Sequence, residues 1–174
     1  IIEGVDRLGK DSLISGLLNE LGFFQVVHYQ KPMKLDAYNG SLATFQQQSF
    51  KKMFAMLDNG GMMLNRAHLG EVVYAPRYRE YSGFYIYRYE SEAKAALDNT
   101  LLVLLTASSW TPIIDDGESF DFSKKGEEQD DFIRAFERSA IKRKLLIDVT
   151  ANDQFRPKQD ILNEVVKAYK RNIL

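Results

Sequence analysis

The chain has 174 residues, of which 45 % are hydrophobic and 27 % are charged, and its net charge at pH 7 is −1. This length suits one compact domain, and this composition is typical of a folded globular protein rather than a disordered one. The absence of cysteine excludes disulfides, thiolate nucleophiles and Cys-ligated zinc, and two histidines are too few for a His-rich metal site. We also expect no nucleic-acid partner, because proteins that bind nucleic acid usually carry an excess of basic residues, and this chain does not.

The sequence gives two indications about localisation. No run approaches 18 apolar residues, so we expect no transmembrane helix and no membrane partner. No basic, apolar leader with a small-residue cleavage site is visible, so we expect a cytoplasmic protein. Ile1 already has the pattern of a strand interior, and we expect a few residues to precede it in the natural chain.

Hydrophobic periodicity and turn residues define the predicted elements of the first half of the chain. They predict, in order, a strand ending at Ile2, a helix over 11–21, a strand over 23–29, a loop over 31–40, a helix of about 17 residues capped by Ser41, and a short strand over 62–64. The apolar stripe of the long helix includes Phe45, Phe50 and Phe54.

The same signals continue through the second half. They predict a helix over 67–74 that Pro76 interrupts, a helix over 91–99, a buried strand over 101–105, a long polar loop over 108–125, a helix over 127–141, a strand over 145–149 and a last helix beginning at Pro157. Five strands separated by helices predict one α/β domain over 1–174 with a mostly parallel sheet. Ligands of such sheets bind beyond the carboxyl ends of the strands.

A phosphate-binding motif lies between the first strand and the first helix. The run Gly4-Val5-Asp6-Arg7-Leu8-Gly9-Lys10 fits the pattern G-x-x-x-x-G-K, and its flanking elements are those that such a loop requires. Backbone N–H groups of the loop and the start of the helix would surround a phosphate. We expect Lys10 to be an exposed charge that reaches the β- and γ-phosphates of a nucleotide.

The residues after Lys10 leave the metal site open. Asp11 stands where a Ser or Thr usually places a hydroxyl on Mg²⁺. Asp11 supplies a carboxylate to the metal, or Ser12 supplies the hydroxyl, or Asp11 is an acidic residue that only stabilises the helix N-terminus. The sequence does not choose among these.

Two motifs carry a resemblance to a family. Glu3-Gly4-Val5-Asp6 with Gly9-Lys10 resembles the E-G-x-D-x-x-G-K loop of thymidylate kinases, and Asn65-Arg66 with Gly70 and Tyr74 is similar to their D-R-x-x-x-S-x-x-x-Y segment. The run Lys10-Asp11-Ser12 resembles the G-K-D-[ST] loop of some phage-type deoxynucleotide kinases. This resemblance implies a three-layer P-loop NTPase fold, binding of ATP with Mg²⁺, and transfer of the γ-phosphoryl group to a nucleotide.

The resemblance also implies roles for individual residues. Lys10 would bind the donor phosphates, Asp6 would lie near the sugar of the acceptor, and Arg66 would bind the phosphate of the acceptor. Arg7, inside the loop, would supply the charge that an arginine brings to the transferred phosphoryl group, with Arg134 and Arg138 as alternatives. Asn65 replaces an acid of the family pattern, so the metal candidates are Asp11, Ser12 and Asn65.

Further residues around Arg66 complete the predicted acceptor site. The planar fork of Arg66 suits a phosphate, although a surface salt bridge with Glu71 is the alternative. The other acceptor candidates are Glu71, Tyr74, Arg77 and Phe45. We expect most of the tyrosines over 74–89 to be packing residues and His68 to face solvent or a neighbouring backbone group.

The loop over 108–125 occupies the position of a kinase lid, which excludes water from phosphoryl transfer. It contains no arginine, and Lys124 and Lys125 are its basic residues. The first hypothesis is a nucleoside monophosphate kinase acting on a deoxynucleotide. A deoxynucleoside kinase and a nucleotide-binding protein without turnover are the alternatives, and a homodimer stays open.

Overall fold

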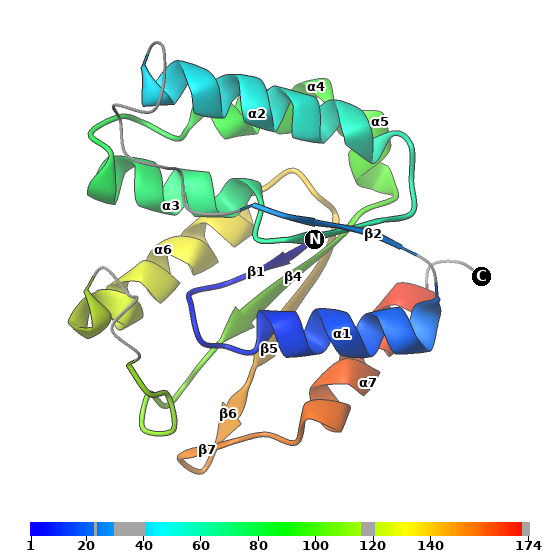
Figure 1. Ribbon diagram of the computed structural model, residues 1–174, viewed down its shortest axis with the longest axis vertical. Coiled ribbons are helices and arrows are strands. Elements are labelled where there is room, and N and C mark those ends of the chain that lie inside the picture. The colour runs from blue at the N-terminus through cyan, green and yellow to red at the C-terminus, as the bar shows by residue number, and fades with distance from the viewer. Residues whose placement is uncertain (23, 30–40, 116–120, 172–174) are drawn as a thin grey trace.

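The computed structural model describes residues 1–22, 24–29, 41–115 and 121–171. Its centre is a five-stranded sheet with the strand order β2-β3-β1-β4-β5, and every pairing in it is parallel (Figure 1). The strands are β1 (Ile2–Glu3), β2 (Gln25–His28), β3 (Met62–Asn65), β4 (Leu101–Thr106) and β5 (Arg143–Asp148). This is the parallel α/β architecture that the alternation of strands and helices predicts, and it is consistent with the P-loop NTPase fold that the resemblance implies.

The central strand β1 is short but is paired on both sides. Ile2 is aligned with Asn65 of β3 and with Val103 of β4, and Glu3 is aligned with Leu104. Parallel pairing brings the carboxyl ends of β1, β2 and β3 to one edge of the sheet. The loop after β1, the last residue of β2 and the last residue of β3 therefore lie together.

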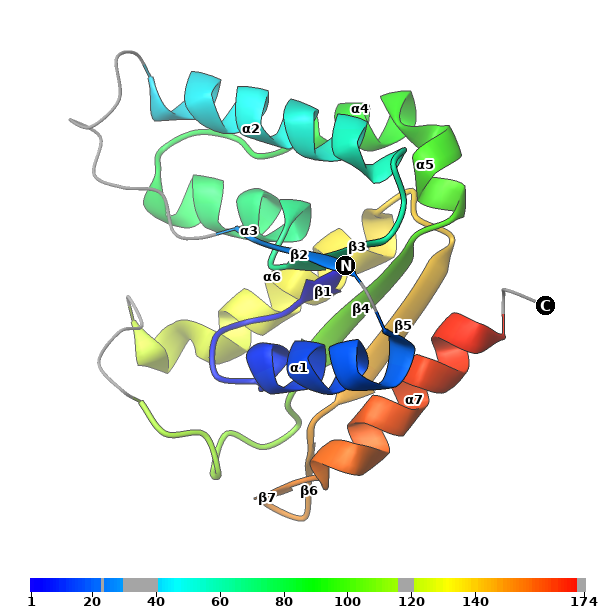
Figure 2. The ribbon, with the colours of Figure 1, turned by 45° about the vertical axis from the view of Figure 1, so that its right-hand side comes forward.

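Helices cover both faces of the sheet (Figures 1 and 2). Helices α1 and α7 pack together on one face, and α3 and α6 pack together on the other, while α2, α4 and α5 pack together beyond α3. The helices are α1 (Lys10–Leu21), α2 (Leu42–Leu57), α3 (His68–Tyr78), α4 (Tyr85–Glu92), α5 (Lys94–Asp98), α6 (Lys125–Arg138) and α7 (Lys158–Lys170). Apolar residues of β1, β3 and β4 form the core between these layers.

Several helix ends agree with the local signals of the sequence. Ser41 precedes α2, and its hydroxyl accepts a hydrogen bond of 3.2 Å from the backbone N–H of Thr44. Gly22 follows α1 with a φ of +87° and donates its N–H to the carbonyl of Leu18. Side-chain and glycine caps satisfy helix-end groups that have no partner inside the helix, so they are readable from the sequence alone.

The interruption predicted at Pro76 is wrong, because α3 continues through this residue to Tyr78. Proline has no N–H for the usual bond to the residue four positions earlier. The side chain of Pro76 is exposed, whereas Ala75 is buried, so the proline ring projects from the exposed side of α3. Burial of the other face of α3 holds the helix together across the proline.

Two other elements differ from the prediction. Helix α4 begins at Tyr85, inside a tyrosine-rich stretch to which the predicted helix over 91–99 did not extend, and α5 covers the rest. Residues after β5 form a small antiparallel hairpin of β6 (Thr150–Ala151) and β7 (Gln154–Phe155). Asn152 and Asp153 turn this hairpin with positive φ angles, and the period-2 signal of two-residue strands is too short to detect.

The described residues include none of one predicted loop and only part of the other. The loop over 31–40 lies outside the described residues, as do residues 116–120 of the predicted lid. The end of that lid is ordered as a 3-10 helix, η2 (Phe122–Lys124), and α6 begins directly after it at Lys125. Within the described part of the chain, no helix is long and apolar enough to span a membrane.

His68 is also placed differently from the prediction. It is fully buried, and its Nε2 lies 2.8 Å from a carboxylate oxygen of Glu90 in α4. Glu90 also accepts hydrogen bonds from the Ser139 hydroxyl and from the N–H of Ala140 after α6. Glu90 therefore links His68 of α3 to the end of α6 inside the protein, and each of these contacts gives a buried polar group a partner.

Candidate functional site

The loop between β1 and α1 has the conformation that its glycines require. Gly4 has a φ of +133°, and a Cβ at this position would lie 2.5 Å from the carbonyl oxygen of Leu105 in β4. Gly9 directly precedes α1 with a φ of +82°. The side chains of Val5 and Leu8 are buried and anchor the loop to the core. The loop backbone is thus wrapped around the N-terminus of α1, where N–H groups and the helix dipole favour an anion.

Lys10 is buried rather than exposed, which corrects the prediction made from its place in a loop. Its Nζ donates hydrogen bonds to the carbonyl oxygens of Gly4 at 2.9 Å and Val5 at 2.6 Å. Burial lowers the pKa of Lys10 to about 8, and the nearby carboxylate of Asp6 opposes this shift. The carbonyl oxygens that hold Lys10 are neutral acceptors. Charged phosphate oxygens bind an ammonium group more strongly, so a phosphate could replace the carbonyls as its partner.

The lowered pKa of Lys10 predicts a pH dependence of nucleotide binding. Below pH 8 the ammonium group is charged and available to a phosphate, whereas above pH 8 it loses its proton in the empty protein. We expect the affinity for a nucleoside triphosphate to fall with rising pH above about 8, by up to about tenfold per pH unit. Titration calorimetry from pH 6.5 to 9.5 measures this, and an affinity that is constant across pH 8–9.5 would contradict it.

Arg66 and Asp6 meet at the mouth of the loop. The guanidinium of Arg66 lies 2.9 Å from the carboxylate of Asp6, and both side chains are more than one-third exposed. The predicted alternative, a salt bridge of Arg66 with Glu71, is wrong because Glu71 is buried and pairs with Arg79 at 2.5 Å. Arg66 therefore lies on the same side of the sheet edge as the loop after β1.

The backbone around Arg66 is unusual and is held from β1. Arg66 has a φ of +58°, a left-handed conformation that costs a non-glycine residue roughly 1–2 kcal/mol. Its N–H donates to the carbonyl of Ile2, and a carboxylate oxygen of Glu3 accepts from the N–H groups of Ala67 at 3.0 Å and Leu69 at 2.9 Å. The buried Glu3 thus caps α3 and fixes the position from which Arg66 projects. Arg7, inside the loop, is likewise left-handed, with a φ of +73°, and exposed.

The proposed metal residues Asp11 and Asn65 are in direct contact. The amide Nδ2 of Asn65 donates to the carboxylate of Asp11 and lies 3.3 Å from Nδ1 of His28 at the end of β2. Asn65 is buried, and its Oδ1 has no hydrogen-bond partner. A carboxylate beside a partnerless amide oxygen fits Mg²⁺, which binds one or two protein oxygens together with waters and phosphates. No cluster of three His, Asp or Glu ligands is present among the described residues.

Ser12 points elsewhere. Its hydroxyl lies 3.5 Å from Nζ of Lys158 at the start of α7, on the opposite flank of α1 from Asn65. Successive residues of a helix are rotated by about 100°, so Asp11 and Ser12 do not reach the same point. Of the three metal candidates, the structure brings together Asp11 and Asn65 only.

The remaining acceptor candidates divide into two groups. Tyr74 packs edge-to-face against Phe132 of α6, and burial together with the charge of Asp6 raises the pKa of Tyr74 well above its usual range. Phe45 is 44 % exposed on α2, and Phe50 of the same stripe is buried against Tyr29. Glu71 accepts from Tyr85 as well as Arg79, and Arg77 binds Glu127 and Asp131 of α6. The polar groups of Glu71 and Arg77 are thus used in structural contacts, which does not favour a role in the acceptor site.

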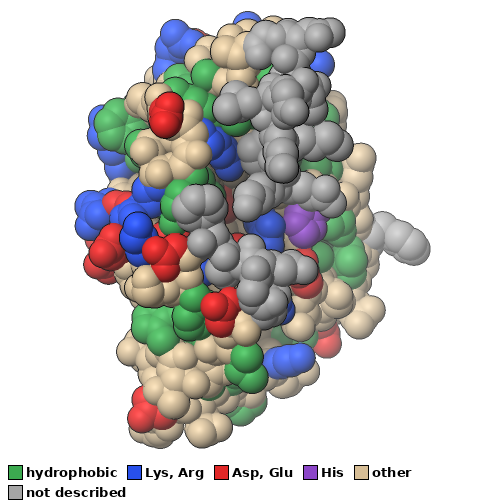
Figure 3. Space-filling model, turned by 60° about the vertical axis from the view of Figure 1, so that its left-hand side comes forward, with side chains coloured by type: hydrophobic (Ala, Val, Ile, Leu, Met, Phe, Trp, Pro, Cys, Tyr) green, Lys and Arg blue, Asp and Glu red, His purple; other side chains and the backbone are tan. Residues whose placement is uncertain are grey.

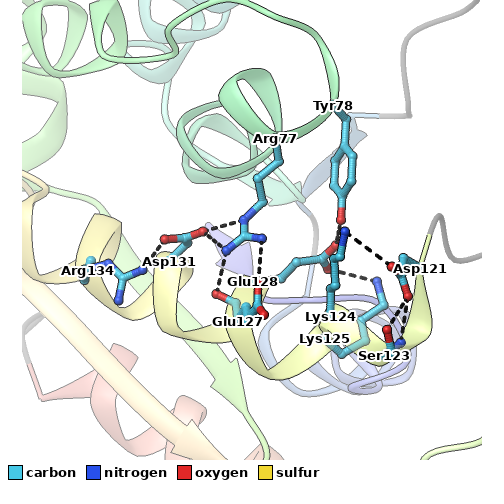
Figure 4. A network of polar contacts seen from close by, with 10 residues as sticks. All are labelled: Arg77, Tyr78, Asp121, Ser123, Lys124, Lys125, Glu127, Glu128, Asp131 and Arg134. Atoms are coloured by element: carbon cyan, nitrogen blue, oxygen red, sulfur yellow. Dashed lines mark hydrogen bonds and ion pairs between the residues drawn. The ribbon is translucent and has the colours of Figure 1, made fainter.

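Lys and Arg side chains lie among Asp and Glu side chains on the face of the molecule shown in Figure 3. Arg77 illustrates this mixture, since both of its partners are carboxylates of the neighbouring helix (Figure 4).

Comparison with solved structures places this fold beside a nucleotide-bound protein. The chain is similar to the YorR protein of Bacillus subtilis, whose crystal structure was determined in complex with phosphorylated GDP. The TM-score is 0.68 over 97 % of this chain and 94 % of that chain, at 14 % sequence identity. At this identity the likeness shows the fold. No protein-family model matches the sequence, and no curated protein matches it significantly.

The structure adds two residues to the candidate site that the sequence analysis did not assign to it. Glu3 was part of the quoted motif, but only the tertiary structure shows that it caps α3. Lys125 was counted as a basic residue of the lid, and the structure places its Nζ 4.0 Å from the carboxylate of Asp6. No local pattern reports a contact between residues 119 positions apart, so no sequence signal was available for it.

Proposed function

We propose that this protein is a nucleoside monophosphate kinase that transfers the γ-phosphoryl group of ATP to a deoxynucleoside monophosphate. In this reaction, the bond between the γ-phosphorus and the β–γ bridging oxygen breaks. A new bond forms between that phosphorus and a phosphate oxygen of the acceptor, and ADP leaves. Positioning and charge stabilisation supply most of the catalysis in such transfers, so the arrangement of cations matters more than any nucleophilic side chain.

The observation that carries the proposal is the place of Arg66. A partly exposed guanidinium stands at the carboxyl edge of the sheet, at the mouth of a phosphate loop, on a backbone conformation that costs free energy. Strained residues that the surrounding structure over-determines gather at functional sites. A phosphate loop needs one cation, Lys10, for the donor, and a second cation beside it has the geometry to hold the phosphate of an acceptor.

Mg²⁺ is the cofactor of this proposal, and Asp11 and Asn65 are the residues that would hold it. When bound, the ion would neutralise the charge of the nucleotide phosphates. Ser12 is a weaker candidate, because its hydroxyl lies toward Lys158. Arg7, exposed in the loop, is proposed to add positive charge at the transferred phosphoryl group, and the backbone of Gly4–Gly9 to surround the donor phosphates.

A deoxynucleoside kinase shares the phosphate loop but needs no cation for an acceptor phosphate. A nucleotide-binding protein without turnover is the second alternative, and the observation that favours it is Asn65, an amide where the thymidylate kinase pattern has an acid. The alternatives differ in measurable ways. Release of ADP with monophosphates, with nucleosides or with neither distinguishes them.

The decisive variant is Arg66→Ala, with Arg88→Ala as its control, because Arg88 is an exposed arginine of α4. We expect Arg66→Ala to lower kcat/KM for the deoxynucleoside monophosphate by about 10- to 100-fold, the usual effect of losing a charge-assisted contact. Arg88→Ala should match the unmodified protein. A coupled assay of ADP release over all common nucleosides and monophosphates measures both. Equal activity on a nucleoside and its monophosphate, or indifference to Arg66→Ala, would contradict the proposal.

A further inference from the structure

Asp6 lies between two cations that come from distant parts of the chain. Its Oδ1 is 2.9 Å from the guanidinium of Arg66, and its Oδ2 is 4.0 Å from Nζ of Lys125. Arg66 follows β3, whereas Lys125 is the first residue of α6. The loop after β1, the end of β3 and the start of α6 therefore meet at one carboxylate.

The burial of Lys125 sets it apart from the lysine beside it. The side chain of Lys125 is 5 % exposed, whereas that of Lys124 is 50 % exposed and pairs with Asp121 on the surface. Glu128, one turn further along α6, lies 3.0 Å from Nζ of Lys125 and also accepts from the hydroxyl of Tyr78 (Figure 4). Desolvating an ammonium group costs several kcal/mol unless anions compensate for it. Here both compensating anions, Asp6 and Glu128, hold the group at the edge of the phosphate loop.

The point that the Asp6 carboxylate occupies would also suit a phosphate group. A carboxylate that spans a guanidinium and an ammonium presents two oxygens to two cations, as a phosphate group would. A phosphate monoester carries up to two negative charges and three oxygens, so it attracts both cations more strongly than a carboxylate does. Asp6 is also 37 % exposed, which leaves this point accessible from solvent.

We propose that Lys125 is the second cation of the acceptor-phosphate subsite. It acts with Arg66 on the same phosphate group, and Asp6 holds the two cations in place when no acceptor is bound. This inference rests on the proposed function, because it needs an acceptor that carries a phosphate. The predicted lid contains no arginine. In this proposal Lys125, at the end of the lid and the start of α6, supplies the positive charge instead.

The test compares the affinities for a deoxynucleoside monophosphate and for the corresponding nucleoside, measured by titration calorimetry without ATP. Lys125→Gln removes the charge but keeps a polar end that can bind Glu128, and Lys125→Arg keeps the charge. Lys124→Gln is the matched control. We expect Lys125→Gln to weaken monophosphate binding at least tenfold and to leave nucleoside binding unchanged. Lys125→Arg should retain most of the preference for the monophosphate, and Lys124→Gln all of it.

Asp6→Asn should change the preference for the monophosphate in the opposite direction from Lys125→Gln. This test does not depend on the folding of a Lys125 variant. Removing the competing carboxylate should raise the ratio of monophosphate affinity to nucleoside affinity, because both cations then act on the phosphate alone. Thermal melting identifies any variant that fails to fold. If Lys125→Gln does not fold, the Asp6→Asn ratio decides, and an unchanged or lower ratio overturns the inference.

The possible results separate this inference from the function on which it rests. A protein that binds neither ligand, or binds both equally, overturns the proposed function and this inference with it. A protein that prefers the monophosphate, and keeps that preference in Lys125→Gln, overturns only the role of Lys125. Equal losses of monophosphate and nucleoside binding in Lys125→Gln overturn it too, because such losses indicate a structural role.

Discussion

Replacing Lys10 with alanine should abolish measurable turnover, with a loss of at least about 10²–10³-fold, the scale of removing one donor from a preorganised charge-stabilising site. Lys10 is the cation beneath the phosphate loop, and its Nζ already lies against the loop carbonyls of Gly4 and Val5. Binding of ATP should weaken in parallel, because Lys10 is proposed to hold the β- and γ-phosphates. ADP release and protection of the protein by ATP in a thermal melt measure the two effects.

The burial of Lys10 changes how this experiment must be controlled. An alanine removes the charge and also the stem that packs under the loop, so Lys10→Met is the matched variant that keeps the volume. Lys52→Ala, an exposed lysine on α2, controls for a general loss of positive charge. We expect both Lys10 variants to lose turnover and Lys52→Ala to keep it. Near-normal ADP release from Lys10→Met would show that the loop does not bind the donor phosphates.

Neutralising Asp11 in the proposed metal site should produce the second large effect. In the proposed site, Asp11 would place a carboxylate beside the donor phosphates, where it would repel them unless a metal ion neutralised the charge. We expect ATP to bind poorly without Mg²⁺, and Asp11→Asn to reduce the effect of Mg²⁺ on ATP affinity by about tenfold, or 1.4 kcal/mol. Titration calorimetry of ATP binding over a range of Mg²⁺ concentrations measures this without reference to turnover.

The double variant tests whether Asp11 and Asn65 act as one unit. Because the amide of Asn65 contacts the carboxylate of Asp11, moving the acid from α1 to β3 should preserve the number of charges at the site. Asp11→Thr alone should be partly tolerated, and Asp11→Thr with Asn65→Asp should recover more of the Mg²⁺-dependent affinity. Losses that simply add in the double variant would refute the exchange, since residues that share one ligand are not additive. Absence of turnover at every Mg²⁺ concentration would favour the binding protein without turnover.

Local signals predicted most of the helices and strands, because they depend on neighbouring residues. The spacing of Leu13, Ile14 and Leu17 defines the buried face of α1, and all three are buried. The unbroken apolar run of β4 reflects a strand covered on both faces. The glycine-containing loop between β1 and α1 was also readable, because its glycines and flanking elements are contiguous. Each of these signals depends on residues that lie only a few positions apart in the sequence.

The prediction failed where packing outweighs local preference. Pro76 removes one hydrogen bond from α3, yet the buried face of the helix keeps it continuous, and the proline faces solvent. His68 is polar and was expected near solvent, but Glu90 of another helix provides a partner inside the core. In both cases the stabilising contacts come from residues that are distant in sequence. A short stretch of sequence does not contain both partners of such a contact.

The sequence by itself determined that this chain folds as strands alternating with helices around a phosphate loop, since period, capping and glycine placement are properties of contiguous residues. Only the tertiary structure decided which charges meet at that loop. Parallel pairing brought Arg66 to Asp6, packing of α6 against α3 brought Lys125 to the same carboxylate, and burial turned Lys10 inward onto the loop carbonyls. The physical reason is that the partner of a charge is chosen by distance in space, and this distance is fixed only when the layers of the fold have packed.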